Sequence, residues 1–167
     1  MKFCPNCTAE LETAEHDGEQ RILCSQRCGF VHWDNPTPVV AVVVETDEGI
    51  VLAHNKNWPP KAYSIITGFL ERGETPEQCA LRETEEELGL VGKTAEFIGF
   101  ELFNGKGYSG EEFNQLIIGF YVRASGTIVL DEKELDAAKI ISRDKLKGWG
   151  TATGQIVQRW LDNISVE

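Results

Sequence analysis

A short acidic helix, predicted at residues 76–88, is the feature that most constrains what this chain can be. Thr75 is a preferred N-cap residue, and Pro76 suits the first helical position because a backbone N–H there would have no helical partner. Gly89 suits the left-handed residue that commonly ends a helix. The sequence therefore predicts a helix with defined ends.

Three glutamates of this helix are neighbours, because Glu83, Glu86 and Glu87 fall within an arc of about 100°. Like charges at these spacings each cost a few tenths of a kcal/mol, and Arg82 is the only cation near them. One interpretation is a solvated acidic face. The other is a Mg²⁺ or Mn²⁺ site, since hard divalent cations prefer clustered oxygen ligands. The opposite side, suited to packing on a sheet, carries Glu77, Leu81, Thr84 and Leu88.

The composition and the predicted elements around the helix indicate a globular domain of mixed helix and strand. A hydrophobic content of 41% and a charged content of 26% are typical of a globular domain. A second helix is predicted at residues 151–163, where apolar residues recur at helical spacing. Strands are predicted at residues 39–44, 50–54, 63–67, 94–103 and 113–123.

Four of the five cysteines lie in the first 28 residues. Cys4 and Cys7 form a C-x2-C pair, and Cys24 and Cys28 form a C-x3-C pair, the arrangement in which short turns deliver tetrahedral zinc ligands. A unit of about 30 residues has almost no core, so bound zinc would supply its folding free energy. Cysteine pairs that bind nothing, or a redox pair, are the alternatives. A closed four-thiolate site predicts no catalysis there.

The stiff, turn-prone segment 35–38 predicts a domain boundary near residue 35. The expected domains are a zinc ribbon at 1–34 and a larger domain at 35–167. Lys and Arg total 16 and Asp and Glu total 27, and the net charge of −11 argues against nucleic-acid and anionic-membrane partners. No secretory signal and no bilayer-length apolar run is visible, so we expect a cytoplasmic protein with reduced thiols.

Residues 68–90 resemble the Nudix box, Gly-x5-Glu-x7-Arg-Glu-U-x-Glu-Glu-x-Gly-U, in which U is an apolar residue. Every polar anchor of this pattern is present. Thr84 stands at a U position, where its β-branched side chain can still pack. The anchors are Gly68, Glu74, Arg82, Glu83, Glu86, Glu87, Gly89 and Leu90.

The resemblance implies an α/β fold, the Nudix α/β/α sandwich around a mixed sheet. It also implies Mg²⁺- or Mn²⁺-dependent hydrolysis of a nucleoside diphosphate linked to another moiety. Arg82 and Glu74 are implied to orient the loop and helix at the substrate, and Glu86 to act as a ligand or as the base for the attacking water. Metal ions would offset the repulsion between this acidic helix and a diphosphate. The implied metal ligands are Glu83, Glu87, Glu86 and the backbone carbonyl of Thr67.

A four-cysteine ribbon directly before a Nudix domain makes the chain similar to the NADH pyrophosphatase branch of this family. That branch carries a further carboxylate ligand at the position of Glu134, which could equally be a surface residue in a charged turn. It also carries a Ser-Gln-Pro-Trp-Pro-Phe-Pro-x-Ser stretch soon after the box, which residues 100–113 lack. The resemblance therefore favours NADH, NAD, FAD or a similar dinucleotide without selecting among them.

Other functions stay open at this stage. A nucleotide sugar or ADP-ribose is the alternative substrate, and a nucleotide-sensing module without catalysis is the alternative function. The expected products are a nucleoside monophosphate and a phosphorylated product. Dimers are common in the family, so a homodimer is a further expectation.

Two loops are candidates for substrate contacts. The predicted hairpin at 94–123 has a glycine-rich loop in which Lys106 and Tyr108 could touch a phosphate and stack on a base. A flexible hairpin without a ligand role is the alternative. The segment 58–61, Trp-Pro-Pro-Lys, could rim the pocket or simply pack its tryptophan on the prolines.

Overall fold

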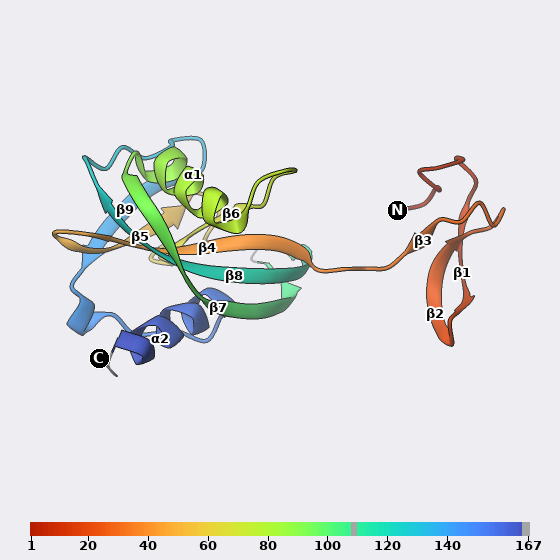
Figure 1. The fold of residues 1–167 in the computed structure, drawn as a ribbon. Coiled ribbons are helices and arrows are strands. Elements are labelled where there is room, and N and C mark those ends of the chain that lie inside the picture. Colours follow the sequence, from red (N-terminus) through yellow and green to blue (C-terminus); the bar gives the residue numbers. More distant parts are fainter. Residues whose placement is uncertain (108–109, 165–167) are drawn as a thin grey trace. The chain divides into compact units, whose positions relative to one another are not determined.

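The computed structural model describes residues 1–107 and 110–164 of the chain. The chain divides into two compact units, Met1–Asn35 and Pro36–Glu167, each with a sheet of its own (Figure 1). None of the helices in the described ranges has the length and apolar character needed to cross a membrane.

The N-terminal unit is a three-stranded antiparallel sheet with very little core. Its strands are β1 (Leu11–His16), β2 (Glu19–Cys24) and β3 (Val31–His32). Asp17 and Gly18 join β1 to β2, and both have positive φ, as a tight two-residue hairpin turn requires. The buried apolar side chains of this unit are Cys4, Leu23 and Cys24. Apolar burial alone is therefore too small to hold it.

The second unit is a mixed sheet between two helices. Its elements are β4 (Thr37–Thr46), β5 (Gly49–Asn55), β6 (Ile66–Phe69), α1 (Pro76–Leu88), β7 (Val91–Lys106), β8 (Glu112–Ser125), β9 (Leu135–Ile141), the 3-10 helix η1 (Arg143–Lys145) and α2 (Ala152–Ile164). The strand order is β7-β8-β4-β5-β9, with β6 also paired to β4. β4 and β8 run parallel, and the other pairs are antiparallel. Helices α1 and α2 cover opposite faces (Figure 1), which confirms the predicted α/β sandwich.

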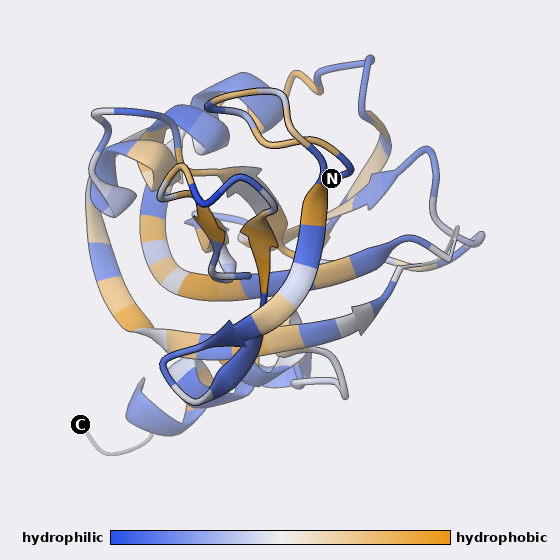
Figure 2. Ribbon diagram, turned by 90° about the vertical axis from the view of Figure 1, so that its right-hand side faces the viewer, coloured by the Kyte–Doolittle hydropathy of each residue, from blue (hydrophilic) through white to orange (hydrophobic). Residues whose placement is uncertain are grey.

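Strand β4 shows why one continuous apolar run suits this fold. Successive side chains of a strand point to opposite faces, and here both faces are covered by a helix. Val40, Val42 and Val44 belong to the core cluster on the α1 face. In Figure 2 the strands of this sheet carry long hydrophobic orange stretches, whereas α1 is mostly hydrophilic blue. The residues on the α2 face are Val39, Ala41 and Val43.

The prediction of the third strand is wrong in its position. The sequence favours residues 63–67, but β6 begins at Ile66 and ends at Phe69, because it pairs antiparallel with the first half of β4. Ser64 makes only an isolated bridge with Ala53. The shift places the start of the Nudix box inside a strand.

The hairpin predicted after the acidic helix is confirmed, and its strands are longer than expected. β7 covers residues 91–106 and β8 covers residues 112–125, so Lys106 belongs to a strand rather than to the loop. Tyr108 lies outside the described residues.

Candidate functional site

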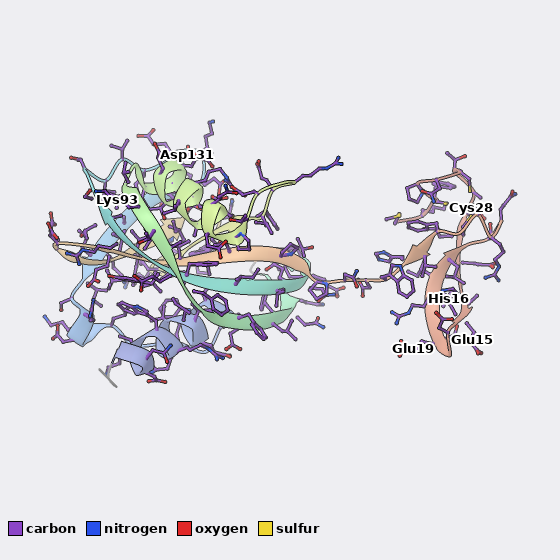
Figure 3. All side chains as sticks on the ribbon, in the orientation of Figure 1. Glu15, His16, Glu19, Cys28, Lys93 and Asp131 are labelled. Atoms are coloured by element: carbon purple, nitrogen blue, oxygen red, sulfur yellow. The ribbon has the colours of Figure 1, made fainter. Side chains whose placement is uncertain are left out.

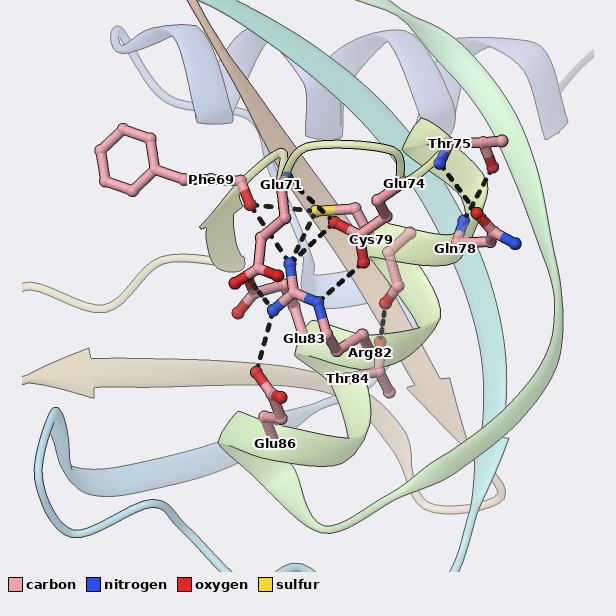
Figure 4. Close-up of polar contacts among 11 residues, drawn as sticks. Phe69, Glu71, Glu74, Thr75, Gln78, Cys79, Arg82, Glu83, Thr84 and Glu86 are labelled. Atoms are coloured by element: carbon pink, nitrogen blue, oxygen red, sulfur yellow. Dashed lines mark hydrogen bonds and ion pairs between the residues drawn. The ribbon is translucent and has the colours of Figure 1, made fainter.

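Helix α1 has the ends that the sequence predicts, and Figure 4 shows the N-terminal one. The Gln78 N–H donates to Thr75 Oγ1 at 3.3 Å, and the Thr75 N–H donates to Gln78 Oε1 at 2.9 Å, which is a reciprocal capping box. Pro76 is the first helical residue, and Gly89 ends the helix with φ of 67°. These caps fix the positions from which the carboxylates of α1 project.

The packing face of α1 differs from the prediction. Glu77 is exposed instead of packed on the sheet, whereas the Glu83 and Glu87 residues are 9% and 8% exposed. Glu86, expected beside them, remains open to solvent. Cys79 and Ala80 on the buried face are small, so the helix can lie close to the sheet. Two carboxylates of the helix are therefore buried against the sheet. The buried residues of α1 are Cys79, Ala80, Glu83, Thr84, Glu87 and Leu88.

Thr84, the one departure from the apolar positions of the box, packs as predicted. It is fully buried. Its Oγ1 donates to the carbonyl oxygen of Ala80 at 2.7 Å, so the hydroxyl is satisfied inside the helix and costs the core little.

Arg82 links the acidic helix to the loop before it (Figure 4). Its Nε and Nη2 donate to the two carboxylate oxygens of Glu74 at 2.7 and 3.0 Å. Its Nη1 donates to Glu83 at 2.7 Å and to Glu86 at 2.9 Å, and Nη2 also donates to the Phe69 carbonyl at 3.2 Å. Because Arg82 donates to its carboxylate, Glu74 has a pKa lowered to about 2. One guanidinium therefore offsets three carboxylates and holds them in fixed positions.

Gly68 in β6 leaves room for Glu83. A Cβ at residue 68 would lie 1.9 Å from both Cδ and Oε1 of Glu83, so no larger residue fits unless the carboxylate moves. Gly68 is absent from the positive-φ residues of the chain. The glycine of the box is thus required by close approach and not by backbone conformation.

Glu87 occupies a different electrostatic environment from Glu74. Burial, reinforced by the charges of Glu83 and Glu134, raises the pKa of Glu87 to about 8. Burial also raises the pKa of Glu83, against the effect of Arg82. Among the described contacts, Arg82 makes none with Glu87. The Glu87 end of the cluster therefore lacks the positive charge that the Glu74 end has.

A hollow at this end brings together three of the predicted metal ligands, Thr67, Glu87 and Glu134. Glu134 is exposed and lies in a turn whose Asp131 N–H donates to the Glu87 carbonyl at 3.1 Å, which ties the turn to the end of α1. Oxygen ligands of this kind fit Mg²⁺ or Mn²⁺. The remaining lining residues are Ala53, Asn55, Trp58, Ile65, Ile66 and Leu135.

The four N-terminal cysteines form the other candidate metal site. Within the described residues, they are the only group of three or more potential ligands whose ligand atoms all lie within 4.8 Å of one another. Cys4 Sγ lies 3.4 Å from Cys28 Sγ, and Cys7 Sγ lies 3.4 Å from Cys24 Sγ. Figure 3 shows Cys28 at the end of this unit that lies away from the β1–β2 turn. Tetrahedral zinc with Zn–S bonds of about 2.3 Å requires sulfur atoms roughly 3.8 Å apart, so the set fits this ion.

Comparison with known proteins gives the family. The model of the NUDIX domain matches residues 35–160, which is most of the chain and the whole of the acidic site. The chain belongs to the NUDIX family. The predicted Nudix resemblance is confirmed.

Two similar relatives both carry the name NAD-capped RNA hydrolase NudC. The protein of Pseudomonas aeruginosa strain LESB58 is 31% identical over 146 residues, which are 87% of this chain and 49% of that protein. The protein of Vibrio atlanticus strain LGP32 is 28% identical over 168 residues, which are 98% of this chain and 59% of that protein. The chain thus spans about half the length of the curated relatives it matches.

A solved structure supports the NUDIX fold over nearly the whole chain. The crystal structure of a NUDIX hydrolase from Nitrosomonas europaea matches with a TM-score of 0.72 and 20% identity, covering 99% of this chain and 93% of that one. At this identity the similarity establishes the fold alone.

Of the two predicted substrate contacts in the glycine-rich loop, the structure describes only Lys106. Lys106 is exposed near the end of β7, where its Nζ lies 3.8 Å from a carboxylate oxygen of Glu112. Tyr108, predicted as its partner in substrate binding, is outside the described residues.

Sequence reasoning missed one interaction beside the hollow. His54, expected only to pack on its strand, places Nδ1 2.6 Å from Asp136 Oδ1 and Nε2 3.2 Å from the Pro59 carbonyl oxygen. Asp136 is brought there by the pairing of β5 with β9. No local signal connects two residues 82 positions apart, so this contact could not be found from periodicity.

Proposed function

We propose that this chain hydrolyses a diphosphate bond in an NAD-like dinucleotide, with Mg²⁺ or Mn²⁺ as cofactor. The observation that carries the proposal is the buried acidic end of α1. Glu83 and Glu87 are buried together, and burial raises the pKa of both carboxyls. A folded protein that maintains such a cluster accepts a cost that bound cations would remove.

The chain's own residues have distinct roles in this proposal. Glu83, Glu87 and Glu134 would hold the cations together with the Thr67 carbonyl, and Glu86 at the solvent edge would be a further ligand or the base. Bound cations would neutralise the diphosphate and polarise the phosphorus. Arg82 and Glu74 hold the carboxylates in place before the substrate arrives, so little reorganisation is needed during the reaction.

The names of the relatives support the choice of substrate. Both are NAD-capped RNA hydrolases, and NAD is the moiety that such an RNA shares with the free dinucleotide. A net charge of −11 favours the free dinucleotide, because binding an RNA chain relies on clustered Lys and Arg. Free ADP-ribose and nucleotide sugars follow as weaker candidates.

We also propose that zinc holds the N-terminal unit and that the protein works in the cytoplasm, where its thiols stay reduced. The closely spaced thiols support zinc, since thiolates are soft ligands that favour it. Because a four-thiolate site leaves no open position, this zinc would be structural.

The test is a substrate panel with the full chain in Mg²⁺ and then in Mn²⁺. The panel contains NAD⁺, NADH, FAD, ADP-ribose, UDP-glucose and an NAD-capped oligoribonucleotide, and the products are separated by chromatography. We expect NAD⁺ or NADH to yield two nucleoside monophosphates. Glu87→Gln should abolish this turnover, and Glu85→Gln, an exposed residue of the same helix, should not. No turnover of any compound, or an active Glu87→Gln protein, would refute the proposal.

A further inference from the structure

The hollow beside Glu87 has an aromatic and apolar side as well as an acidic one. Trp58 and Ile65 line it together with Glu87 and Glu134. Trp58 is half-buried and contributes to the wall of this hollow. Carboxylates and an indole thus line one hollow, a combination suited to a ligand with both a charged group and a flat ring.

The loop that carries Trp58 is tied to the turn that carries Glu134. The Lys56 N–H donates to the Glu134 carbonyl at 2.9 Å. Two bonds then close a tight turn, because the Asn57 N–H donates to Asn55 Oδ1 at 3.0 Å and the Trp58 N–H donates to the Asn55 carbonyl at 2.9 Å. The backbone from which Trp58 projects is therefore fixed relative to the turn of Glu134.

His54 holds the other end of this loop. Both ring nitrogens face acceptors, the Asp136 carboxylate at 2.6 Å and the Pro59 carbonyl at 3.2 Å. An imidazole can donate from both nitrogens only when it is protonated, so this arrangement selects the imidazolium. The other neighbouring groups are the Tyr63 ring, 5.5 Å from the imidazole centroid, and Lys139, whose Nζ lies 4.1 Å from the Tyr63 centroid.

We propose that Trp58 is a substrate-binding residue that stacks on one flat ring of the dinucleotide, and that His54 is the positioning residue that fixes its loop. The inference rests on the proposed function and deepens it by naming what selects the substrate. The diphosphate would lie at Glu87 and Glu134. The ring, separated from the diphosphate by a ribose, would then lie against the indole.

The first test measures steady-state kinetics of Trp58→Ala and Trp58→Phe on NAD⁺ and on ADP-ribose. Stacking on an aromatic side chain predicts a rise in KM of roughly 5- to 100-fold for Trp58→Ala, with kcat within about threefold of wild type and Trp58→Phe in between. Trp149→Phe, on the α2 face of the sheet, is the matched control and should leave both constants unchanged. An equal rise for both substrates identifies adenine as the stacked ring, and a rise for NAD⁺ alone identifies nicotinamide. An unchanged KM overturns the inference while the wild-type turnover still supports the proposed function.

A binding measurement covers the case in which Trp58→Ala does not fold. The indole N–H signals of the Glu87→Gln protein are followed by NMR while NAD⁺ is added, and the signal missing in Trp58→Phe identifies Trp58. We expect this signal to move and the Trp149 signal to stay. Movement of neither at saturating NAD⁺ overturns the inference whether or not the wild type is active.

A double-mutant cycle tests the role of His54. If His54 acts through Trp58, His54→Ala raises KM for NAD⁺, and adding His54→Ala to Trp58→Ala raises it no further. Full additivity of the two effects on KM, or an effect of His54→Ala on kcat alone, would show that His54 does not position Trp58.

Discussion

The two units of this protein differ in what holds them together. Apart from its four adjacent cysteines, the described part of the N-terminal unit buries only Leu23, whereas the NUDIX unit has an apolar core cluster on each face of its sheet. A bound metal would supply most of the folding free energy of the first unit. In the second unit the core is already packed, and burial of the Glu83 and Glu87 carboxyls against it costs stability.

The contrast teaches that a metal site can be structural or functional according to what surrounds it. In the ribbon, Cys24 has a pKa lowered to about 6, chiefly because the Cys28 backbone N–H donates to its sulfur, while contacts with the neighbouring thiols raise the pKa of Cys7 to about 12. One thiolate of the cluster is therefore favoured even without metal. At the NUDIX site, burial has the opposite effect and keeps Glu87 protonated near neutral pH. The proposed zinc would therefore stay bound to the ribbon, whereas a cation at the NUDIX site would have to displace the proton of Glu87.

Removing a ribbon thiol should have the largest effect. Cys24→Ser is expected to unfold the N-terminal unit alone, because a structural four-ligand zinc site contributes about 10–16 kcal/mol in small zinc domains. In a ¹H–¹⁵N spectrum the signals of β1 and β2 should collapse to random-coil positions, while those of β4 and β8 stay in place. Cys79→Ala is the control, since this cysteine lies in the core of the other unit. A Cys24→Ser protein with an intact hairpin would mean that metal is not what holds the ribbon.

Glu87→Gln should have the next largest effect, and it should reduce activity while leaving the fold intact. It keeps the shape of the side chain but removes a metal ligand, so kcat should fall by about a thousandfold or more, as is common when a group that acts on the transition state is lost. The folded structure should nevertheless be retained, because an amide avoids the cost of a buried charge. Kinetics and a thermal melt of the same sample measure both. A Glu87→Gln protein that is inactive because it is unfolded would remove the contrast between the units.

The pH dependence of stability in metal-free protein tests the same carboxyl. Glu87 has a pKa raised from its usual 4.5 to about 8 in the folded state, so the folded state binds more protons than the unfolded state between these values. The contribution of Glu87 is therefore fully present below about pH 4.5 and is lost as the pH rises through about 8, about 5 kcal/mol in all. Urea unfolding at pH 5 and pH 8.5 should show this loss in wild type and a smaller one in Glu87→Gln. Saturating Mg²⁺ should reduce the difference for wild type, since cations favour the charged form.

How far the sequence could predict this molecule depends on how local each signal is. The ends of α1 were predictable because Thr75, Pro76 and Gly89 act within a few residues. The burial of Glu83 was not predictable, because it depends on Gly68, whose place beside α1 follows from the pairing of β6 with β4. Helical spacing placed Thr84 and Leu88 on the buried side correctly, but it placed Glu77 there as well. It left Glu83 and Glu87 on the solvent side, because a helical pattern takes no account of the space that a glycine leaves.

The same limit applies to the hollow. The resemblance named Glu134, and its place beside Glu87 follows from a turn bonded to the end of α1. Contacts such as that of His54 with Asp136 depend on which strands are neighbours. Strand order is a property of the whole sheet, and no periodic pattern in one segment contains it.

Gly68→Ala should give an intermediate effect confined to the site. The added methyl group would occupy the place of the Glu83 carboxylate, 1.9 Å from its Cδ, so that side chain must move. We expect a fall in kcat of about 10- to 100-fold, because small displacements of a positioned group are costly to catalysis. Gly73→Ala is not a suitable control, since Gly73 has a φ of 86°, but Gly150→Ala adds a methyl group in open space. Equal kinetics for Gly68→Ala and wild type would show that Glu83 does not need its observed position.

Thr75→Ala should have the smallest effect, and it isolates the part of the NUDIX unit that needs no metal. The substitution removes the Oγ1 that accepts from the Gln78 N–H, and loss of an N-cap costs about 1 kcal/mol. The loss should be the same with and without Mg²⁺, because the cap lies at the opposite end of α1 from Glu87. Thr75→Ser retains the hydroxyl and should recover most of the loss. If the loss of stability appeared only with Mg²⁺ present, the cap and the metal site would be energetically coupled. The stability of the packed core would then depend on bound cations.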